Sequence, residues 1–144
     1  MSDNVFFSKE DFFKANMERK LNDIDYIHMT FSLSKLPVDV ALSFSKLFIP
    51  DMKVIDGIII LSDCYEDEQK RRYLDDKNDK SQFWVNLIEI TGIFEEMSVL
   101  EAEIFGDALA ASWNSKIKCE FSLDQGTARR ITDAEMDEVF ITID

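Results

Sequence analysis

The side chains best suited to acid–base or metal chemistry form an acidic cluster directly after the most apolar segment of the chain. Ile58–Leu61 is followed by Asp63, and then by Glu66, Asp67 and Glu68. Carboxylates beyond the end of a strand are a common setting for catalytic and divalent-metal sites. The spacing, however, lacks the alternating ligands, central glycine and twelfth-position glutamate of an EF-hand loop. A solvated, charged turn therefore explains this cluster better than a metal site does.

Nucleophiles and metal ligands elsewhere in the sequence are poorly placed for catalysis. His28 is the only histidine, and no cysteine or second histidine stands near it to complete a metal site. Cys64 precedes a run of acids that raise the pKa of a thiol, and Cys119 is predicted to be a buried thiol on the apolar side of a helix. The four glycines form neither a nucleophile elbow nor a phosphate-binding loop. We therefore expect a non-enzymatic protein without a cofactor or a metal.

The net charge is the unusual bulk property of this sequence. Twenty-nine acidic residues against sixteen lysines and arginines give a formal charge of -13. Such a surface repels nucleic-acid phosphates and anionic membranes, so direct binding to either is not expected. The charge favours solubility, and it would also accelerate the encounter with a basic protein partner.

The negative charge is concentrated in two stretches that contain no lysine or arginine. The first runs from Ser81 to Ser115 and the second from Ile131 to Asp144, and together they carry eleven acidic residues. A helix dipole is balanced by one or two carboxylates, so it does not explain thirty-five residues without a base. We predict that acids of these stretches contact a partner, namely Glu95, Glu96, Glu101, Glu103, Asp107, Asp133, Glu135, Asp137 and Glu138.

Apolar periodicity and capping residues predict several helices. The clearest begins after Ser98, which forms a capping box with Glu101, and it continues to about Glu120. Its core stripe has the i, i+4 spacing of a buried helix face and consists of Phe105, Leu109, Trp113 and Ile117. Further helices are expected over about residues 9–21, from Pro37 to the stop at Pro50, over a short segment at 71–74, and from Ser81 to about Gly92.

Strand patterns complete the expected fold. Tyr26–Leu33 alternates between polar and apolar residues, and Val54–Leu61 is a continuous apolar run in which Gly57 marks a bulge or a close approach of the backbone. Thr127–Ile131 and Val139–Ile143 are expected to close a terminal hairpin. A strand–helix–strand unit near the start permits one parallel crossover. The prediction is an α+β fold in which residues 1–144 form a single domain, with a mixed sheet of about four strands packed against several helices.

Targeting signals are not expected in this sequence. The first four residues lack the basic start and apolar run of a signal peptide. The longest apolar stretch, Ile58–Leu61, is far shorter than the roughly 20 residues that span a bilayer. Two cysteines without CxxC spacing indicate free thiols in a reducing compartment. The predicted location is therefore the cytoplasm.

In overall character the chain resembles bacterial toxin-immunity proteins, including those of contact-dependent inhibition systems. The small acidic chain carries the resemblance, together with the acidic stretches from Glu95–Glu96 to Asp107 and from Asp133 to Glu138. The resemblance implies a cytosolic, non-catalytic protein that plugs the active site of a toxin. Because it rests on no motif, it assigns no family residue to this chain.

Three functions remain open at this point. The first is an immunity-type inhibitor of a basic, nuclease-like cognate toxin, whose site would be occupied by carboxylates in place of nucleic-acid phosphates. The second is a DNA-mimic regulator that occupies a nucleic-acid-binding protein of its own cell. The third is a small carboxylate-dependent enzyme that uses the acids from Asp63 to Glu68.

Overall fold

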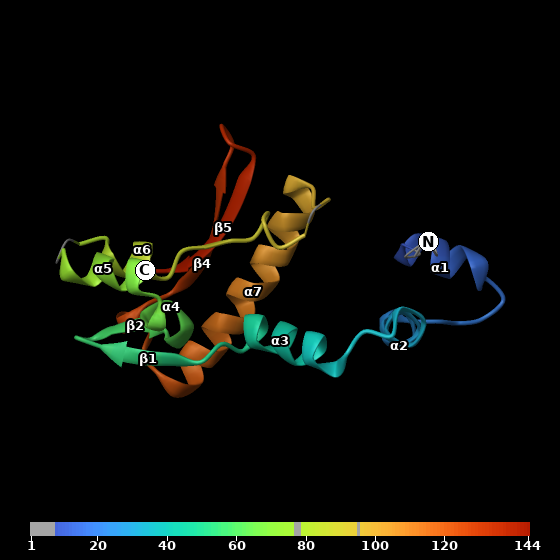
Figure 1. Cartoon of the computed structure of the whole chain (residues 1–144), viewed down its shortest axis with the longest axis horizontal. Coiled ribbons are helices and arrows are strands. Elements are labelled where there is room, and N and C mark those ends of the chain that lie inside the picture. The colour runs from blue at the N-terminus through green and yellow to red at the C-terminus, as the bar shows by residue number, and fades with distance from the viewer. Residues whose placement is uncertain (1–7, 77–78, 95) are drawn as a thin grey trace. The chain divides into compact units, whose positions relative to one another are not determined.

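A computed structural model describes residues 8–76, 79–94 and 96–144, and it confirms the predicted α+β class (Figure 1). The chain divides into two compact units, Met1–Ser43 and Phe44–Asp144, which are described separately below. The single domain expected over residues 1–144 stays a prediction. In chain order the elements are α1 (Lys9–Ala15), α2 (Asp23–Ser34), α3 (Val38–Phe48), β1 (Met52–Ile55), β2 (Ile58–Leu61), α4 (Ser62–Glu66), α5 (Glu68–Asp75), α6 (Ser81–Val85), β3 (Ile88–Glu89), α7 (Val99–Glu120), the 3-10 turn η1 (Leu123–Gln125), β4 (Ala128–Asp133) and β5 (Glu138–Ile143).

The first unit contains α1, α2 and the first part of α3. The segment Tyr26–Leu33, predicted as a strand, lies within helix α2, so that prediction was wrong. The physical reason is local, because Asn22 and Asp25 form a capping box that satisfies the first amides of the helix. No residue of α2 is buried, so the alternating pattern did not reflect a half-buried strand. Helix α1 begins after Ser8 as expected, but it ends at Ala15 instead of continuing to about residue 21.

The apolar run from Val54 to Leu61, predicted as one central strand, folds back on itself. Strands β1 and β2 pair antiparallel, and Ile55 lies opposite Ile58. Asp56 and Gly57 connect them with φ angles of 51° and 84°. An Asp-Gly pair with both φ angles positive is the preferred two-residue hairpin turn. The glycine therefore marks a tight turn and not a bulge.

An asparagine side chain covers the outer edge of β2. The side-chain nitrogen of Asn86 donates to the carbonyl oxygen of Ile59 at 2.9 Å, and the N–H of Leu61 donates to the Asn86 side-chain oxygen at 2.9 Å. Asn86 is fully buried, and these two bonds satisfy it there. The helix expected from Ser81 to about Gly92 therefore ends at Val85, just before Asn86.

The second sheet has the strand order β3-β5-β4, and all of its pairings are antiparallel. The expected single mixed sheet of about four strands is therefore wrong, because the structure contains two separate antiparallel sheets. One expected strand is helix α2, and another forms a hairpin of its own, so no parallel crossover arises. The predicted terminal hairpin is confirmed as β4 and β5.

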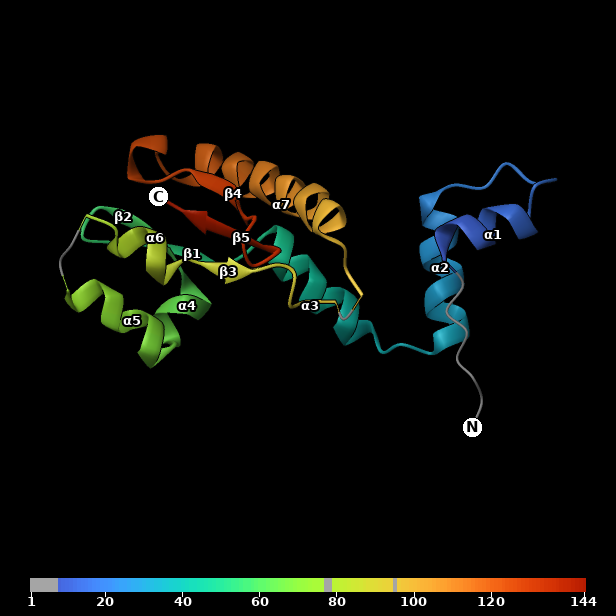
Figure 2. The same cartoon turned by 90° about the horizontal axis from the view of Figure 1, so that it is seen from above.

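Helix α7 packs along β4 and β5 and supplies much of the core (Figure 2). Its predicted capping box is present, and Leu109, Trp113 and Ile117 of the predicted stripe are buried, with Phe105 packed beside them. A Cβ atom on Gly106 would lie 2.8 Å from the Cδ1 atom of Ile90 and 3.1 Å from the Cδ atom of Arg130. The glycine therefore permits the close approach of helix and sheet at this point.

Candidate binding surface

The two acidic stretches of the sequence meet beside β4. Arg130 on β4 donates from Nε to Asp107 at 2.8 Å and from Nη1 to Glu103 at 3.0 Å. The hydroxyl of Thr132 donates to the same Glu103 oxygen at 2.7 Å. Asp133 follows directly along β4. The first half of α7 therefore lies beside the β4–β5 hairpin, with Glu103 and Asp107 on the α7 side of the sheet and Asp133 and Glu138 on the other side. We refer to the acids along this part of β4 as the acidic face and define it by Glu103, Asp107, Asp133, Glu135, Asp137 and Glu138.

The hairpin turn holds four of these carboxylates in a short space. Asp133 accepts hydrogen bonds from the N–H groups of Glu135 and Met136, at 3.0 and 3.2 Å, and so shapes the turn. Asp137 has a φ of 55°, a left-handed conformation that aspartate tolerates better than most residues. Glu138 lies directly opposite Asp133 in the strand register. Like charges at opposed positions are unfavourable for the fold.

Within the acidic face, Arg130 neutralises the carboxylates of α7 but not those of the turn. The hydrogen bond to Asp107 and the charges of Asp107 and Glu103 raise the pKa of Arg130, so the guanidinium stays charged. Among the described residues, no ion pair involves Asp133, Glu135, Asp137 or Glu138. The turn is therefore the part of the face with the most uncompensated negative charge.

The remaining predicted partner residues do not belong to this face. Glu101 accepts hydrogen bonds from the N–H and the hydroxyl of Ser98, at 2.9 and 2.8 Å, and the first of these is the main cause of its lowered pKa. At about 100° per residue it lies roughly 200° around α7 from Glu103, so it caps the helix on another side. Glu96 is exposed before the helix, and Glu95 lies outside the described residues. Of the predicted acids, two thus meet at Arg130 and four share the hairpin turn at the end of β4.

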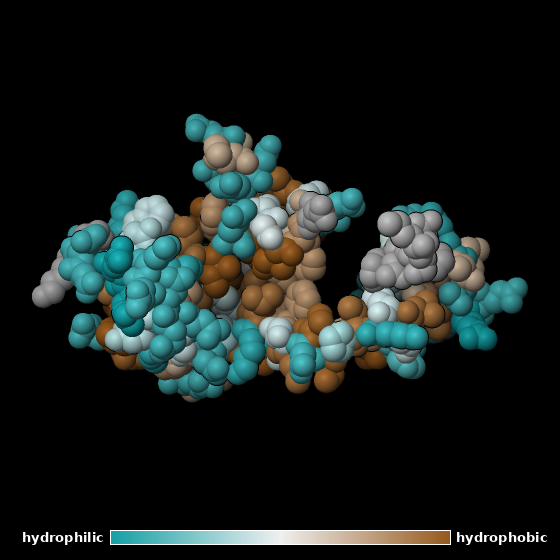
Figure 3. Space-filling view, in the orientation of Figure 1, coloured by the Kyte–Doolittle hydropathy of each residue, from teal (hydrophilic) through white to brown (hydrophobic). Residues whose placement is uncertain are grey.

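Exposed apolar side chains accompany the acids, and the sequence reasoning missed them. Leu100 and Ile104 on α7 are 66% and 64% exposed, and Met136 in the hairpin turn is 66% exposed. The tip of the hairpin, at the top of Figure 3, is mostly hydrophilic with an apolar group in it. The spacing of Leu100 and Ile104, on the helix side away from the buried stripe, was a signal that could have revealed them. Apolar contacts surrounded by charge are typical of protein-binding surfaces.

The side of the sheet that faces away from α7 adds a further carboxylate. Glu89 of β3 pairs with Phe140 of β5, and Phe140 pairs with Ile131 of β4. Phe140 and Ile131 are only partly buried, and Asp133 and Glu138 lie at the next position on this side of the sheet. Sequence reasoning placed Glu89 in a helix, so it could not assign this residue to the sheet. The acids thus surround a small apolar area on this side as well.

No protein-family model, curated protein or solved structure matches this chain. The function must therefore be argued from the surface itself. In the part of the chain that the structure describes, no helix is long and apolar enough to cross a membrane.

The other candidate residues for chemistry are dispersed. Among residues 8–76, 79–94 and 96–144, no group of three or more histidine, cysteine or acidic side chains could hold a metal ion. In the acidic cluster after β2, Asp67 caps α5 by accepting from the N–H groups of Gln69 and Lys70. His28 is exposed on α2. The acids from Asp63 to Glu68 therefore surround helix ends and do not converge on one site.

The two cysteines differ in their surroundings. Cys64 is buried, and desolvation, opposed mainly by the charge of Lys70, raises the pKa of its thiol. The predicted direction is confirmed, although burial contributes more than the neighbouring acids. Cys119 is exposed, so its predicted burial was wrong. Two residues beyond the buried Ile117, it falls on the opposite side of α7.

The basic cluster Lys70–Arg72 contacts neighbouring elements of its unit. Lys70 donates to the carbonyl oxygen of Leu87 at 2.6 Å. Arg71 lies over the ring of Tyr65 at 5.6 Å, and Lys53 lies over the same ring at 3.8 Å. These contacts attach α5 to the rest of its unit.

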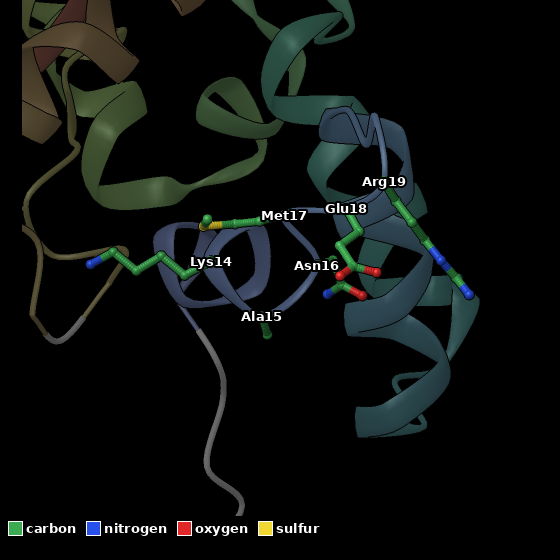
Figure 4. A pocket seen from close by; sticks show the side chains of 6 residues that line it. All are labelled: Lys14, Ala15, Asn16, Met17, Glu18 and Arg19. Carbon is green, nitrogen blue, oxygen red and sulfur yellow. The ribbon is translucent and has the colours of Figure 1, made fainter.

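A hollow of about 460 Å³ lies beside the end of α1 in the first unit. Six consecutive residues, 14–19, line it, and the side chains of Lys14 and Arg19 point away from each other (Figure 4). A catalytic site needs converging groups, so this hollow supports no reaction.

Proposed function

We propose that this protein is a non-enzymatic binding protein of the immunity type, which inhibits a basic, nuclease-like toxin in the cytoplasm. The observation that carries the proposal is the acidic face, where Arg130 of β4 holds Glu103 and Asp107 of α7 beside a hairpin turn that carries four further carboxylates. Carboxylates at this density resemble the phosphates of a nucleic acid in charge. They would occupy the substrate surface of the toxin and pair with its lysines and arginines.

In this proposal the charge governs the rate of association with the partner, and the apolar contacts govern the rate of dissociation. The net charge of -13 accelerates the encounter with a basic partner, and this effect weakens with added salt. Leu100, Ile104 and Met136 offer apolar area at short range, which slows dissociation once the complex has formed.

The cross-strand pair of Asp133 and Glu138 also supports binding over solubility. A lysine at either position would form an opposite-charge pair and stabilise the hairpin. The acids therefore occupy a position where they weaken the fold. Binding to a basic partner gives a physical reason for carboxylates there, because the partner supplies the missing opposite charge.

A DNA-mimic regulator of a host nucleic-acid-binding protein would use the same acidic face. The two proposals differ in the partner and not in the surface. A toxin partner predicts that loss of this protein harms the cell when the toxin is present, whereas a host partner predicts altered activity of a resident protein.

The proposal is tested by co-expression with the product of the immediately upstream gene. We expect that the neighbouring protein alone arrests growth, and that co-expression restores growth and yields a co-purifying complex. A neighbour that is not toxic and does not bind would reject the immunity function. A pull-down from native lysate would then test the host-directed alternative.

A charge-reversal pair tests whether the acidic face is the contact surface. Glu135→Lys/Glu138→Lys should weaken the complex by about tenfold or more, because like charges then face the partner. Asp75→Lys/Asp76→Lys makes the same change in net charge at exposed positions near the end of α5, away from the acidic face, and serves as the matched control. Equal affinity for both variants would show that the acids act only through net charge.

A further inference from the structure

Strand β4 is an edge strand of the sheet β3-β5-β4, and its outer edge lies beside the acidic face. Thr127 and Asp144 exchange two main-chain hydrogen bonds, at 2.9 and 3.1 Å. Since bonded pairs alternate along an antiparallel ladder, Arg129, Ile131 and Asp133 bond to β5. The main-chain groups of Ala128 and of the next two alternate residues along β4 therefore point away from β5.

At Ala128 this edge is already occupied by a side chain. Asn114 of α7 donates to the carbonyl oxygen of Ala128 at 2.8 Å, and its side-chain oxygen accepts from the Ala128 N–H at 2.8 Å. The amide group takes the place that a neighbouring strand would take. The accessible edge of β4 therefore begins after Ala128.

The next two residues of β4 whose main-chain groups point away from β5, Arg130 and Thr132, are not capped in this way by a side chain of the described residues. Within the described parts of the chain, no hydrogen bond reaches the main-chain N–H or C=O of Arg130 or Thr132 on the side away from β5. These residues supply two donors and two acceptors at the spacing of a β ladder. An open edge of this kind can accept an extended segment from another chain.

The charges on both sides of this edge select the occupant. Glu103 and Asp107 lie on the α7 side, and Asp133 and Glu138 lie on the other side of the sheet. Side chains of an added strand alternate between the two sides, so both sets would meet carboxylates. A second copy of this chain, which also carries a charge of -13, would be repelled. Lysine and arginine side chains would be attracted most on the side of Asp133 and Glu138, because Arg130 offsets part of the negative charge on the α7 side.

We propose that the β4 edge at Arg130 and Thr132 binds an extended, basic segment of the partner protein as an added antiparallel strand. The proposal rests on the proposed function, because it assigns a binding mode to the acidic face. Main-chain hydrogen bonds would fix the segment in register, and the flanking acids would select its charge.

A synthetic peptide tests the edge directly. The probe is acetyl-Lys-Val-Lys-Val-Lys-Val-amide, and the control has the same sequence with every main-chain amide N-methylated. Binding is followed by amide chemical shifts of the full-length protein. We expect the N–H signals of Arg130 and Thr132 to shift more than those of Arg129 and Ile131. N-methylation should weaken binding by about tenfold or more, because the donors to β4 are lost while the charge is kept.

Variants of Thr132 provide a second measurement. Thr132→Pro removes the outward N–H but no bond to β5, and proline is tolerated on edge strands. Thr132→Ala, which loses only the hydroxyl contacts, is the matched control. We expect Thr132→Pro to weaken peptide binding about tenfold relative to Thr132→Ala.

The outcomes separate this proposal from the wider function. No binding of the basic peptide, or equal binding of its N-methylated form, overturns the strand-addition mode. If the N-methylated peptide still binds in a salt-dependent way, the acidic face remains a binding surface without strand addition. If the wild-type protein dimerises in light scattering and Thr132→Pro does not, the edge belongs to a second copy and the proposal is wrong.

Discussion

Replacing Glu138 by lysine should stabilise the fold while it weakens the proposed binding. Glu138 lies directly opposite Asp133 at the end of the β4–β5 ladder, and the two carboxylates repel each other. Lysine removes this repulsion and adds an opposite-charge pair. Cross-strand pairs contribute about 0.2–1 kcal/mol, and solvent exposure reduces the value. We therefore expect a gain of about 0.5 kcal/mol in the free energy of unfolding.

Urea unfolding at low salt measures this gain. Glu138→Gln, which removes only the repulsion, should give about half of it. In about 1 M salt, where charges are screened within about 3 Å, the difference between the variants should largely disappear. Glu135→Lys is the matched control, because Glu135 lies in the turn and has no opposed strand residue.

A double-mutant cycle isolates the pair. In a protein that already carries Asp133→Asn, the effect of Glu138→Lys should fall toward zero. A stabilisation that persists there, or a loss of stability in Glu138→Lys alone, would refute the argument from the strand register. The same lysine should weaken partner binding, so stability and binding would change in opposite directions.

Asn86→Leu should destabilise the protein by about 1–3 kcal/mol in urea unfolding, because the Leu61 N–H would be buried without a partner while the Ile59 carbonyl keeps only its bond from Gln82; a neutral result would mean that water replaces the amide. The capping carboxylate of Glu101 has a pKa lowered below its usual 4.5, so its contribution is present above pH 4.5 and is lost as pH falls through the folded-state pKa. Glu101→Gln should lack this part of the acid dependence of unfolding, and a variant with the same pH profile as the wild type would argue against the cap. A thiol reagent at neutral pH should label Cys119 at once and Cys64 only on unfolding, whereas equal labelling rates would contradict the burial of Cys64.

Features set by neighbouring residues were predictable from the sequence. The capping box of Ser98 and Glu101 and the apolar stripe of α7 both act within a few residues, and both are present. The turn at Asp56 and Gly57 was equally local, but the long apolar run around it indicated a single strand. Helix α2 was missed because an alternating pattern outweighed the cap at Asn22.

Features set by distant residues could not be predicted in this way. Strand β3 has two residues and exists because Ile88 pairs with Ile141, more than fifty positions away. The charge distribution did indicate an acidic surface. Only the fold shows that Arg130 of β4 pairs with Glu103 and Asp107 of α7. The short strand and this ion-pair cluster both depend on contacts between residues far apart in the sequence, so no local sequence pattern indicates them.

The central claim is that the acidic face binds a basic partner through its own carboxylates. The most direct test is the dissociation constant of the complex with the partner found by co-expression, measured over a range of salt concentrations. We predict that the wild type and Asp75→Lys/Asp76→Lys bind with similar affinity and similar salt dependence, whereas Glu135→Lys/Glu138→Lys binds about tenfold or more weakly and with a smaller salt dependence. Equal affinity and equal salt dependence of the two variants would contradict the account.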